Sequence, residues 1–260
     1  MPQLELVRAK AQMVKSLEEY YNSIRTNIQF SGRNLKVITL TSAQPSEGKS
    51  MTATNLAISF AKAGFRTLLI DADTRHSVMS GTFKSQERYE GLSSYLSGNA
   101  ELSDVICDTT VDNLMVILAG KIPPNPTSLI QNDNYDKMIE TVRDLYDYVI
   151  IDTPPLGRVV DAAIIAHSSD ASLLVTKPGV DKRRTITKLK DQLEQSGSVF
   201  LGVILNRFDF KADKYGYGYG YGYGYGYGYG YGYGYGYGYG KYGKDEKEKS
   251  DKSSRKKAKN

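Results

Sequence analysis

The feature that most constrains the fold of this chain is a series of short, continuous apolar runs separated by stretches with helical spacing. The runs are KVITLTS, TLLID, YDYVIID, ASLLVT and VFLGVILN, and helical spacing covers residues 52–63 and 182–195. Strands of a parallel sheet read as continuous Val, Ile and Leu because helices bury both of their faces. The sequence therefore predicts an α/β fold, with a doubly wound, mostly parallel sheet over residues 35–212.

Residues 1–34 and 213–260 fall outside this alternating pattern. Apolar residues recur at three- and four-residue steps over residues 12–30, which predicts that 1–34 is a helical segment. Residues 213–243 are dominated by a Tyr-Gly repeat, and glycine raises the entropy cost of ordering a chain. We expect a disordered tail there, followed by a charged, disordered end over 244–260.

Composition excludes several classes of protein. The formal net charge is +5, but residues 241–260 hold nine Lys or Arg against four Asp or Glu, so the remainder is neutral and no nucleic-acid partner is expected. The single cysteine, Cys107, excludes an internal disulfide and a cysteine-based metal cage. No run reaches the ~20 apolar residues that span a bilayer, and the start lacks an apolar signal region. We expect a cytoplasmic protein.

The stretch VITLTSAQPSEGKSMTATN places Gly-Lys-Ser between a predicted strand and a predicted helix. Ala43 stands where a phosphate-binding loop usually has its first glycine. Amide groups at a helix N-terminus favour anions, so this loop would surround nucleotide phosphates, with Lys49 at the β and γ oxygens and Ser50 on Mg²⁺. An ordinary surface turn is the alternative. The predicted nucleotide-binding residues are Ser46, Glu47, Gly48, Lys49, Ser50 and Met51.

Two further predicted strands end in acidic residues. LLIDADTR gives Asp71 and Asp73, and VIIDTPP gives Asp152. A carboxylate at the end of a buried strand is costly without a partner, so each acid is expected to face a cation. The alternative is that an acid caps a loop or pairs with Arg75. All three acids share the sheet edge with the phosphate loop, which favours Mg²⁺ binding through Asp152 and a catalytic or metal-binding role for Asp71 and Asp73.

Together, SAQPSEGKS, LLIDADTR and VIIDTPP resemble the three Walker-type motifs of the bacterial tyrosine kinases, the cytoplasmic autokinases of capsule and exopolysaccharide assembly. The resemblance covers about residues 12–243 and implies a fold of the phosphate-loop NTPase type, with ATP and Mg²⁺ as cofactors. It implies that the catalytic residues are Lys49, Asp71 and Asp73, and that the metal ligands are Ser50, Asp71, Asp73 and Asp152.

The same resemblance implies partners for the chain. A membrane-anchored activator would complete the site with its cytoplasmic end and hold the kinase at the inner face of the membrane, and a tyrosine phosphatase would act as antagonist. Members of the family form rings through an E-x-x-R-x-x-R helix motif, which implies a homo-oligomer and a contact of segment 1–34 with a partner or a second copy. Glu19 and Arg25 match that motif and are the implied interface residues, whereas Asn22 replaces its first arginine.

The Tyr-Gly tail is the expected phosphate acceptor. A tyrosine hydroxyl has a pKa of about 10, so a base must take its proton, and Asp71 or Asp73 is the candidate. Tethering keeps the tail at a local concentration of about millimolar, and glycine between the tyrosines lets each phenol enter a narrow cleft. Aromatic self-association of the tail is the alternative. The expected acceptors are Tyr215, Tyr217, Tyr219, Tyr221, Tyr223, Tyr225, Tyr227, Tyr229, Tyr231, Tyr233, Tyr235, Tyr237, Tyr239 and Tyr242.

Two other functions compete with the kinase. Partitioning and division-site ATPases share the fold but carry a second lysine five residues before the loop lysine, where this chain has Gln44. That substitution disfavours their mechanism, in which the extra lysine reaches across a dimer. The other alternative is a scaffold that responds to nucleotide and associates with itself through the aromatic tail.

Overall fold

The computed structural model describes residues 2–32, 34–85 and 87–208. These residues belong to one compact unit, Met1–Asp213. The second unit, Lys214–Asn260, lies outside the described residues, and so do all the expected acceptor tyrosines and the charged end.

Strands and helices alternate along most of the described chain. The strands are β1 Gln3–Leu6, β2 Val37–Ser42, β3 Thr67–Asp71, β4 Phe83–Ser85, β5 Ile106–Thr109, β6 Leu114–Ile117, β7 Tyr148–Asp152, β8 Ala171–Thr176 and β9 Val199–Leu205. The helices are α1 Arg8–Ser16, α2 Glu18–Ser31, α3 Lys49–Lys62, α4 Leu92–Leu96, α5 Leu102–Val105, α6 Pro126–Ile130, α7 Asp133–Leu145, α8 Asp161–His167 and α9 Arg183–Gln195, with a 3-10 turn at Met79–Gly81. Among the described residues, no helix has the length and apolar character needed to cross a bilayer.

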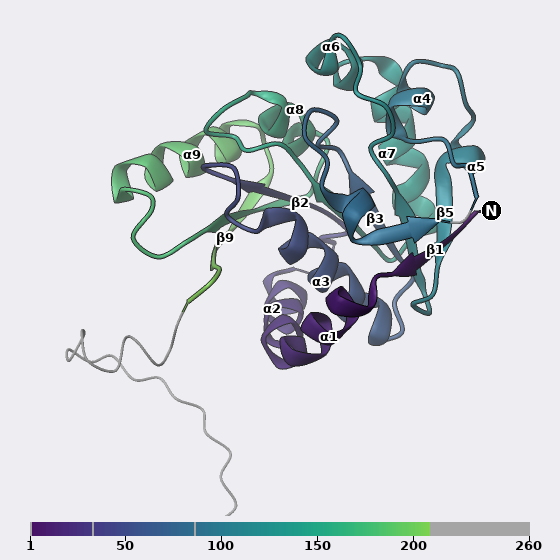
Figure 1. Cartoon of the computed structure of the whole chain (residues 1–260). Coiled ribbons are helices and arrows are strands. Elements are labelled where there is room, and N and C mark those ends of the chain that lie inside the picture. The colour runs from purple at the N-terminus through teal and green to yellow at the C-terminus, as the bar shows by residue number, and fades with distance from the viewer. Residues whose placement is uncertain (1, 33, 86, 209–260) are drawn as a thin grey trace, which may run out of the picture. The chain divides into compact units, whose positions relative to one another are not determined.

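Within the described residues, nine strands form one sheet in the order β4-β1-β5-β6-β3-β7-β2-β8-β9 (Figure 1). Neighbouring strands are parallel except for two antiparallel pairs, β1 with β4 and β5 with β6. The prediction of a doubly wound, mostly parallel α/β sheet is confirmed.

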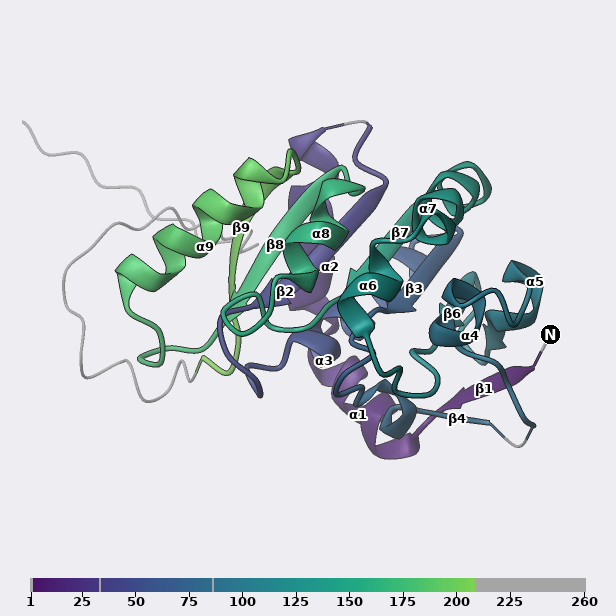
Figure 2. The ribbon, with the colours of Figure 1, turned by 90° about the horizontal axis from the view of Figure 1, so that it is seen from above.

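Helices cover both faces of the sheet. In Figures 1 and 2, α1, α2 and α3 lie on one face, and α7, α8 and α9 lie on the other. Strand β7 contributes to both layers, because Ile150 packs in the cluster that includes α3, whereas Val149 and Ile151 pack in the cluster that includes α7. Successive side chains of a strand point to opposite faces, so a continuous apolar run fits a strand that is buried on both sides.

The N-terminal residues differ from the single helix expected over residues 12–30. They form two helices, α1 and α2, and the backbone at Leu17 between them turns to φ −108° and ψ 4°. Strand β1, which precedes both helices, pairs with β4 and β5 in the main sheet. The helix α2 is joined to α3 by Arg25, whose guanidinium donates to the Ser59 carbonyl at 2.8 Å.

Three central strands bring the predicted site residues to one edge of the sheet. Strand β7 lies between β3 and β2, and Asp71 is paired in register with Asp152 across β3 and β7. The loop from β2 to α3 begins beside these acids, since Leu40 of β2 is also paired with Asp152. The carboxyl ends of parallel strands meet at this edge, where the loops of such a fold form a ligand site.

Candidate active site

The loop between β2 and α3 leaves its amide groups available to a ligand. Within the described part of the chain, the amides of residues 46–51 donate to no backbone carbonyl outside the helix. Helix α3 begins at Lys49, so these amides lie at the positive end of a helix dipole. Gly48 has φ +89°, which favours glycine, and a Cβ there would lie 2.0 Å from Nδ2 of Asn206. The loop therefore has the backbone geometry of an anion site.

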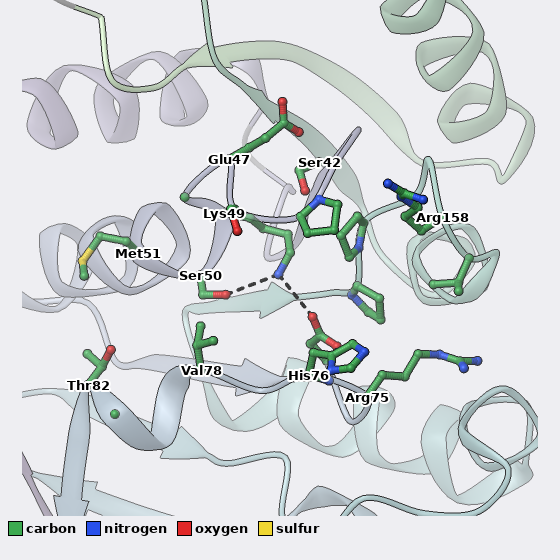
Figure 3. Close-up of a pocket in the computed structure, with 18 of the residues that line it drawn as sticks. Ser42, Glu47, Lys49, Ser50, Met51, Arg75, His76, Val78, Thr82 and Arg158 are labelled. Carbon is green, nitrogen blue, oxygen red and sulfur yellow. Dashed lines mark hydrogen bonds and ion pairs between the residues drawn. The ribbon is translucent and has the colours of Figure 1, made fainter. Parts of the chain in front are cut away.

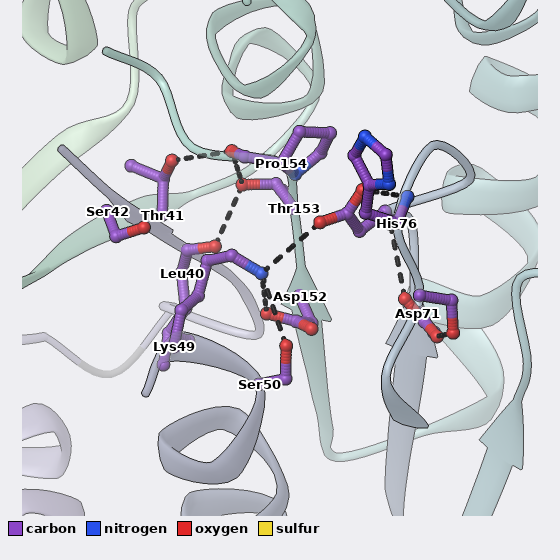
Figure 4. A network of polar contacts seen from close by, with 12 residues as sticks. Leu40, Thr41, Ser42, Lys49, Ser50, Asp71, His76, Asp152, Thr153 and Pro154 are labelled. Atoms are coloured by element: carbon purple, nitrogen blue, oxygen red, sulfur yellow. Dashed lines mark hydrogen bonds and ion pairs between the residues drawn. The ribbon is translucent and has the colours of Figure 1, made fainter. Parts of the chain in front are cut away.

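Lys49 is at the centre of a polar network at this loop. Its side chain is 7% exposed, and Nζ donates to Oδ1 of Asp152 at 2.6 Å. Oγ of Ser50 lies 3.4 Å from the same Nζ, and Oδ2 of Asp73 lies 3.9 Å from it. Figure 4 shows Lys49 and Ser50 of α3 next to Asp152 at the end of β7. The structure thus brings together Lys49, Ser50, Asp73 and Asp152.

Asp71 is fully buried next to this network. Its carboxylate accepts hydrogen bonds from the amide of Asp73 at 3.2 Å and from the hydroxyl of Ser77. Burial, together with the neighbouring Asp152 carboxylate, raises the pKa of Asp71 to about 7, because the charged form is poorly solvated there. Asp73, in contrast, lines the adjoining cavity and accepts from the amide of His76 at 3.0 Å.

Asp152 provides the observation that bears on a metal ion. Its Oδ1 accepts a hydrogen bond from Nζ of Lys49. Its Oδ2 is buried and has no hydrogen-bond partner among the described residues. Burial raises the pKa of Asp152, and an unsatisfied buried oxygen is costly. Mg²⁺ uses only one or two protein oxygens and completes its shell with water and phosphate, so Asp152 with Ser50 fits that ion. The described residues contain no group of three or more His, Cys, Asp or Glu side chains placed to hold a metal ion by themselves.

The network opens into a cavity of about 810 Å³ (Figure 3). This volume lies within the usual range for ligand pockets. Five of the lining residues are cationic, namely Lys10, Lys49, Arg75, Arg158 and Arg207. The acidic lining residues in the described chain are Asp73 and Glu47. An excess of positive charge next to available amides suits a polyphosphate ligand.

The predicted nucleotide-binding residues all line this cavity. Glu47 lines it without turning its carboxylate toward the phosphate site, since the residue is 1% exposed and its carboxylate points away from Lys49 (Figure 3). Several lining residues were not assigned to the site from the sequence, among them Lys10 of α1 and His76 after β3. No motif lies near Lys10, which only the folded chain brings to the loop, whereas His76 directly follows the LLIDADTR motif.

Glu19 and Arg25, the residues expected at an oligomer interface, lie on α2. Glu19 is exposed. Arg25 is half-buried and donates to Oδ1 of Asn22 at 3.2 Å as well as to Ser59. Asn22 also accepts from the hydroxyl of Ser59 at 2.9 Å. Arg25 is therefore connected to α3 within its own chain, and its role between chains stays a prediction.

Comparison with known proteins agrees with the motifs. A family model described as an AAA domain matches residues 35–199. The tyrosine-protein kinase CpsD of Streptococcus agalactiae serotype III is 57% identical to this chain over 216 residues, which cover 83% of this chain and 93% of that protein.

Solved structures confirm the predicted phosphate-loop NTPase type of fold. The kinase domain of the Escherichia coli tyrosine kinase ETK has a TM-score of 0.69 and 32% identity, over 78% of this chain and 80% of that chain. The septum site-determining protein MinD of Pyrococcus horikoshii, solved with Mg-ADP, has a TM-score of 0.57 and 26% identity, over 66% of this chain and 70% of that chain. The family match over most of the chain and the CpsD identity place this chain in the AAA-domain family and, within it, among the bacterial tyrosine-protein kinases.

Proposed function

We propose that this kinase is an ATP-dependent autokinase, which transfers the γ-phosphoryl group of ATP to tyrosines of its own tail, residues 215–242. The observation that supports this most is the convergence of Lys49, Ser50, Asp73 and Asp152 at the phosphate loop. Together these groups can bind a triphosphate, a metal ion and a hydroxyl at one point. Phosphoryl transfer depends mainly on such positioning and on electrostatic stabilisation.

Lys49 is placed to exchange its acidic partners for phosphate oxygens. Its Nζ lies 2.6 Å from Asp152 and 3.9 Å from Asp73. A triphosphate offers charge-assisted hydrogen bonds, so the ammonium group would stabilise the β and γ oxygens as charge builds up on them. Ser50 and Asp152 would hold Mg²⁺, which neutralises negative charge on the phosphates when it is bound. Oδ2 of Asp152, without a partner among the described residues, is available for that role.

We assign Asp73 to the proton of the tyrosine hydroxyl. Asp73 lines the cavity, whereas Asp71 is fully buried. A general base must reach the proton that it removes, so geometry favours Asp73 although the Asp71 pKa of about 7 would suit proton transfer at neutral pH. Asp71 accepts from the amide of Asp73 and thereby fixes the segment that carries the base. The negative charge of Asp71 in its ionised form would help to hold Mg²⁺.

The cellular setting is part of the same proposal. A membrane-anchored activator completes the site with its cytoplasmic end, and the kinase acts as a homo-oligomer at the inner face of the membrane. There it regulates capsule or exopolysaccharide polymerisation and export, and a tyrosine phosphatase reverses the modification. Similarity to CpsD and to the ETK kinase domain supports this setting. Each phosphate would add about −1.5 to −2 charges beside the positive residues 241–260, so a few would reverse the local charge.

A partitioning-type ATPase is the second candidate, because the MinD structure shares this fold. Gln44 occupies the position where those ATPases carry their second lysine. Its Oε1 accepts from Nε of Arg158 at 3.2 Å, so the side chain is engaged within its own chain. This contact favours the kinase over an ATPase that reaches across a dimer.

The proposal is tested by incubating the purified chain and its activator's cytoplasmic segment with Mg²⁺ and labelled ATP, then mapping phosphate by mass spectrometry. We expect phosphotyrosine within residues 215–242 that disappears in Lys49→Met. It should persist in Lys62→Met, the matched control, which removes a half-exposed lysine at the other end of α3. Free phosphate without phosphoprotein would support the ATPase, and neither product would support the scaffold.

A further inference from the structure

The Glu47 carboxylate connects the phosphate loop to the sheet instead of facing the cavity. The residue is 1% exposed, and Figure 3 shows its carboxylate pointing away from Lys49. Oε2 accepts from the amide of Gln44 at 2.7 Å, which closes the loop on itself. Oε1 lies 3.2 Å from the hydroxyl of Thr176, the last residue of β8. The Glu47 side chain therefore connects two positions of the loop with each other and with the end of β8.

Thr176 shares its hydroxyl between two acids. Its Oγ1 lies 3.2 Å from Oε1 of Glu47 and 2.8 Å from Oδ2 of Asp181, in the loop after β8. A hydroxyl has one proton to donate, so it cannot satisfy two ionised carboxylates at once. The hydrogen bonds are complete when one of the two acids carries a proton. In agreement with this geometry, burial and the contact with Asp181 raise the pKa of Glu47.

Asn206, directly after β9, makes the third connection. Its backbone N–H donates to the backbone carbonyl of Thr176 at 2.8 Å. Its side-chain Nδ2 donates to the backbone carbonyl of Glu47 at 2.8 Å. The same Nδ2 fills the space beside Gly48, where a Cβ would come within 2.0 Å of it. The loop is thus held from the side chain of Glu47, from its carbonyl, and by the close approach at Gly48.

We propose that Glu47, Thr176 and Asn206 form a loop brace, a set of positioning residues that holds the phosphate loop in its binding conformation by tying it to the ends of β8 and β9. The inference rests on the proposed nucleotide site at that loop. The brace acts through the amides of residues 46–51, which it keeps ordered before the ligand arrives. A loop that must be ordered on binding lowers affinity, so a loop fixed in advance binds phosphate more tightly without any new contact.

The test measures Mg-ADP affinity by titration calorimetry on the full chain. Glu47→Ala removes both side-chain contacts, and its dissociation constant should rise about tenfold or more. Glu47→Gln keeps an acceptor for Gln44 and gains an amide donor toward Thr176, as a protonated Glu47 would, so it should restore most of the lost affinity. Thr176→Val keeps the shape but removes the shared hydroxyl, and the dissociation constant should rise about threefold or more.

A matched control separates positioning from a general loss of stability. Asn132→Ala removes the N-cap of α7, where the side chain accepts from the amide of Tyr135. It should lower the melting temperature while Mg-ADP affinity stays within about twofold of the wild type. In steady-state assays with ATP, Glu47→Ala should raise KM while kcat stays within about threefold, because the brace acts on binding.

Wild-type affinity in folded Glu47→Ala and Thr176→Val proteins would overturn the brace, and so would a Glu47→Gln protein that binds as weakly as Glu47→Ala. If Glu47→Ala does not fold, Thr176→Val alone decides. Binding of Mg-ADP does not require tyrosine transfer. A wild-type chain that binds Mg-ADP but forms no phosphotyrosine would therefore refute the autokinase and leave the brace standing, and one that binds no Mg-ADP would refute both.

Discussion

Replacing Asp71 by Asn should make the nucleotide-free protein more stable, and increasingly so as the pH rises. Asp71 is fully buried at the end of β3 and is paired in register with Asp152. Burial and the Asp152 carboxylate raise its pKa from 3.8 to about 7. An asparagine keeps an acceptor for the amide of Asp73 and can donate to the hydroxyl of Ser77, so the substitution removes the charge but preserves the local hydrogen bonds.

The size of the effect follows from proton linkage. Because the folded protein binds the Asp71 proton more tightly than the unfolded chain does, the free energy of unfolding falls as the pH rises from about 4 to about 7. A difference of about three pKa units corresponds to ~4 kcal/mol once the group is ionised in both states. About half of that is already lost near pH 5.5, so the advantage of Asp71→Asn should grow by ~2 kcal/mol between about pH 5.5 and about pH 8.

Urea denaturation of the protein without nucleotide or Mg²⁺ at these two pH values measures the difference. The matched control is Asp112→Asn, which removes an exposed carboxylate from the loop before β6 and should show no such growth. Equal effects of Asp71→Asn at the two pH values, or a loss of stability at the higher one, would show that ionisation of Asp71 carries no cost in the folded state.

Three further substitutions test other parts of the structure. Gly48→Ala should remove most Mg-ADP binding in calorimetry, since φ is +89° and a Cβ would lie 2.0 Å from Asn206; retained affinity would contradict the loop geometry. Tyr135→Phe should raise the free energy of unfolding in urea by about 1 kcal/mol, because the buried hydroxyl has no partner among the described residues. A clear loss of stability would mean that the hydroxyl has a hydrogen-bond partner. Arg75→Ala should lower the free energy of unfolding in urea by ~2–3 kcal/mol, because the fully buried Asp161 loses the guanidinium whose Nε lies 2.7 Å from its Oδ2. Unchanged stability would mean that Asp161 needs no cation.

The phosphate loop and the central strands could be predicted because their signals are local. Strands β2, β3, β7 and β8 each appear in the sequence as a continuous apolar run, and Gly-Lys-Ser stands at the start of α3. Burial on both faces imposes that pattern on the residues themselves. Parallel strands then bring Asp71 and Asp152 to the same edge, so the approach of the two acids follows from the class of fold.

Other features depend on pairs of residues that are distant in the sequence. Strand β1 has only four residues, and it exists as a strand because β4 and β5 supply its hydrogen bonds. The sequence places Glu47 in the loop but does not show whether its carboxylate faces phosphate or sheet. The carboxylate contacts Thr176 and the backbone carbonyl of Glu47 contacts Asn206, which lie 129 and 159 residues further along the chain. No local period or motif carries information about such pairs.

The carboxylates of the loop brace and those of Asp71 and Asp152 differ in whether they need a bound cation. The Glu47 carboxylate lies within hydrogen-bond distance of the Gln44 amide and of the Thr176 hydroxyl, so the brace needs no ligand to be satisfied. Among the described residues, Lys49 is the ion-pair partner of Asp152 and its charge also acts on Asp71, while burial raises the pKa of both acids. A bound cation would favour their ionised forms, so saturating Mg-ADP should raise the melting temperature of the wild type more than that of Asp71→Asn. Equal shifts in the two proteins would mean that the stability lost by burying Asp71 is not recovered through the metal, and Asp71 would then have to be removed from the ligand set.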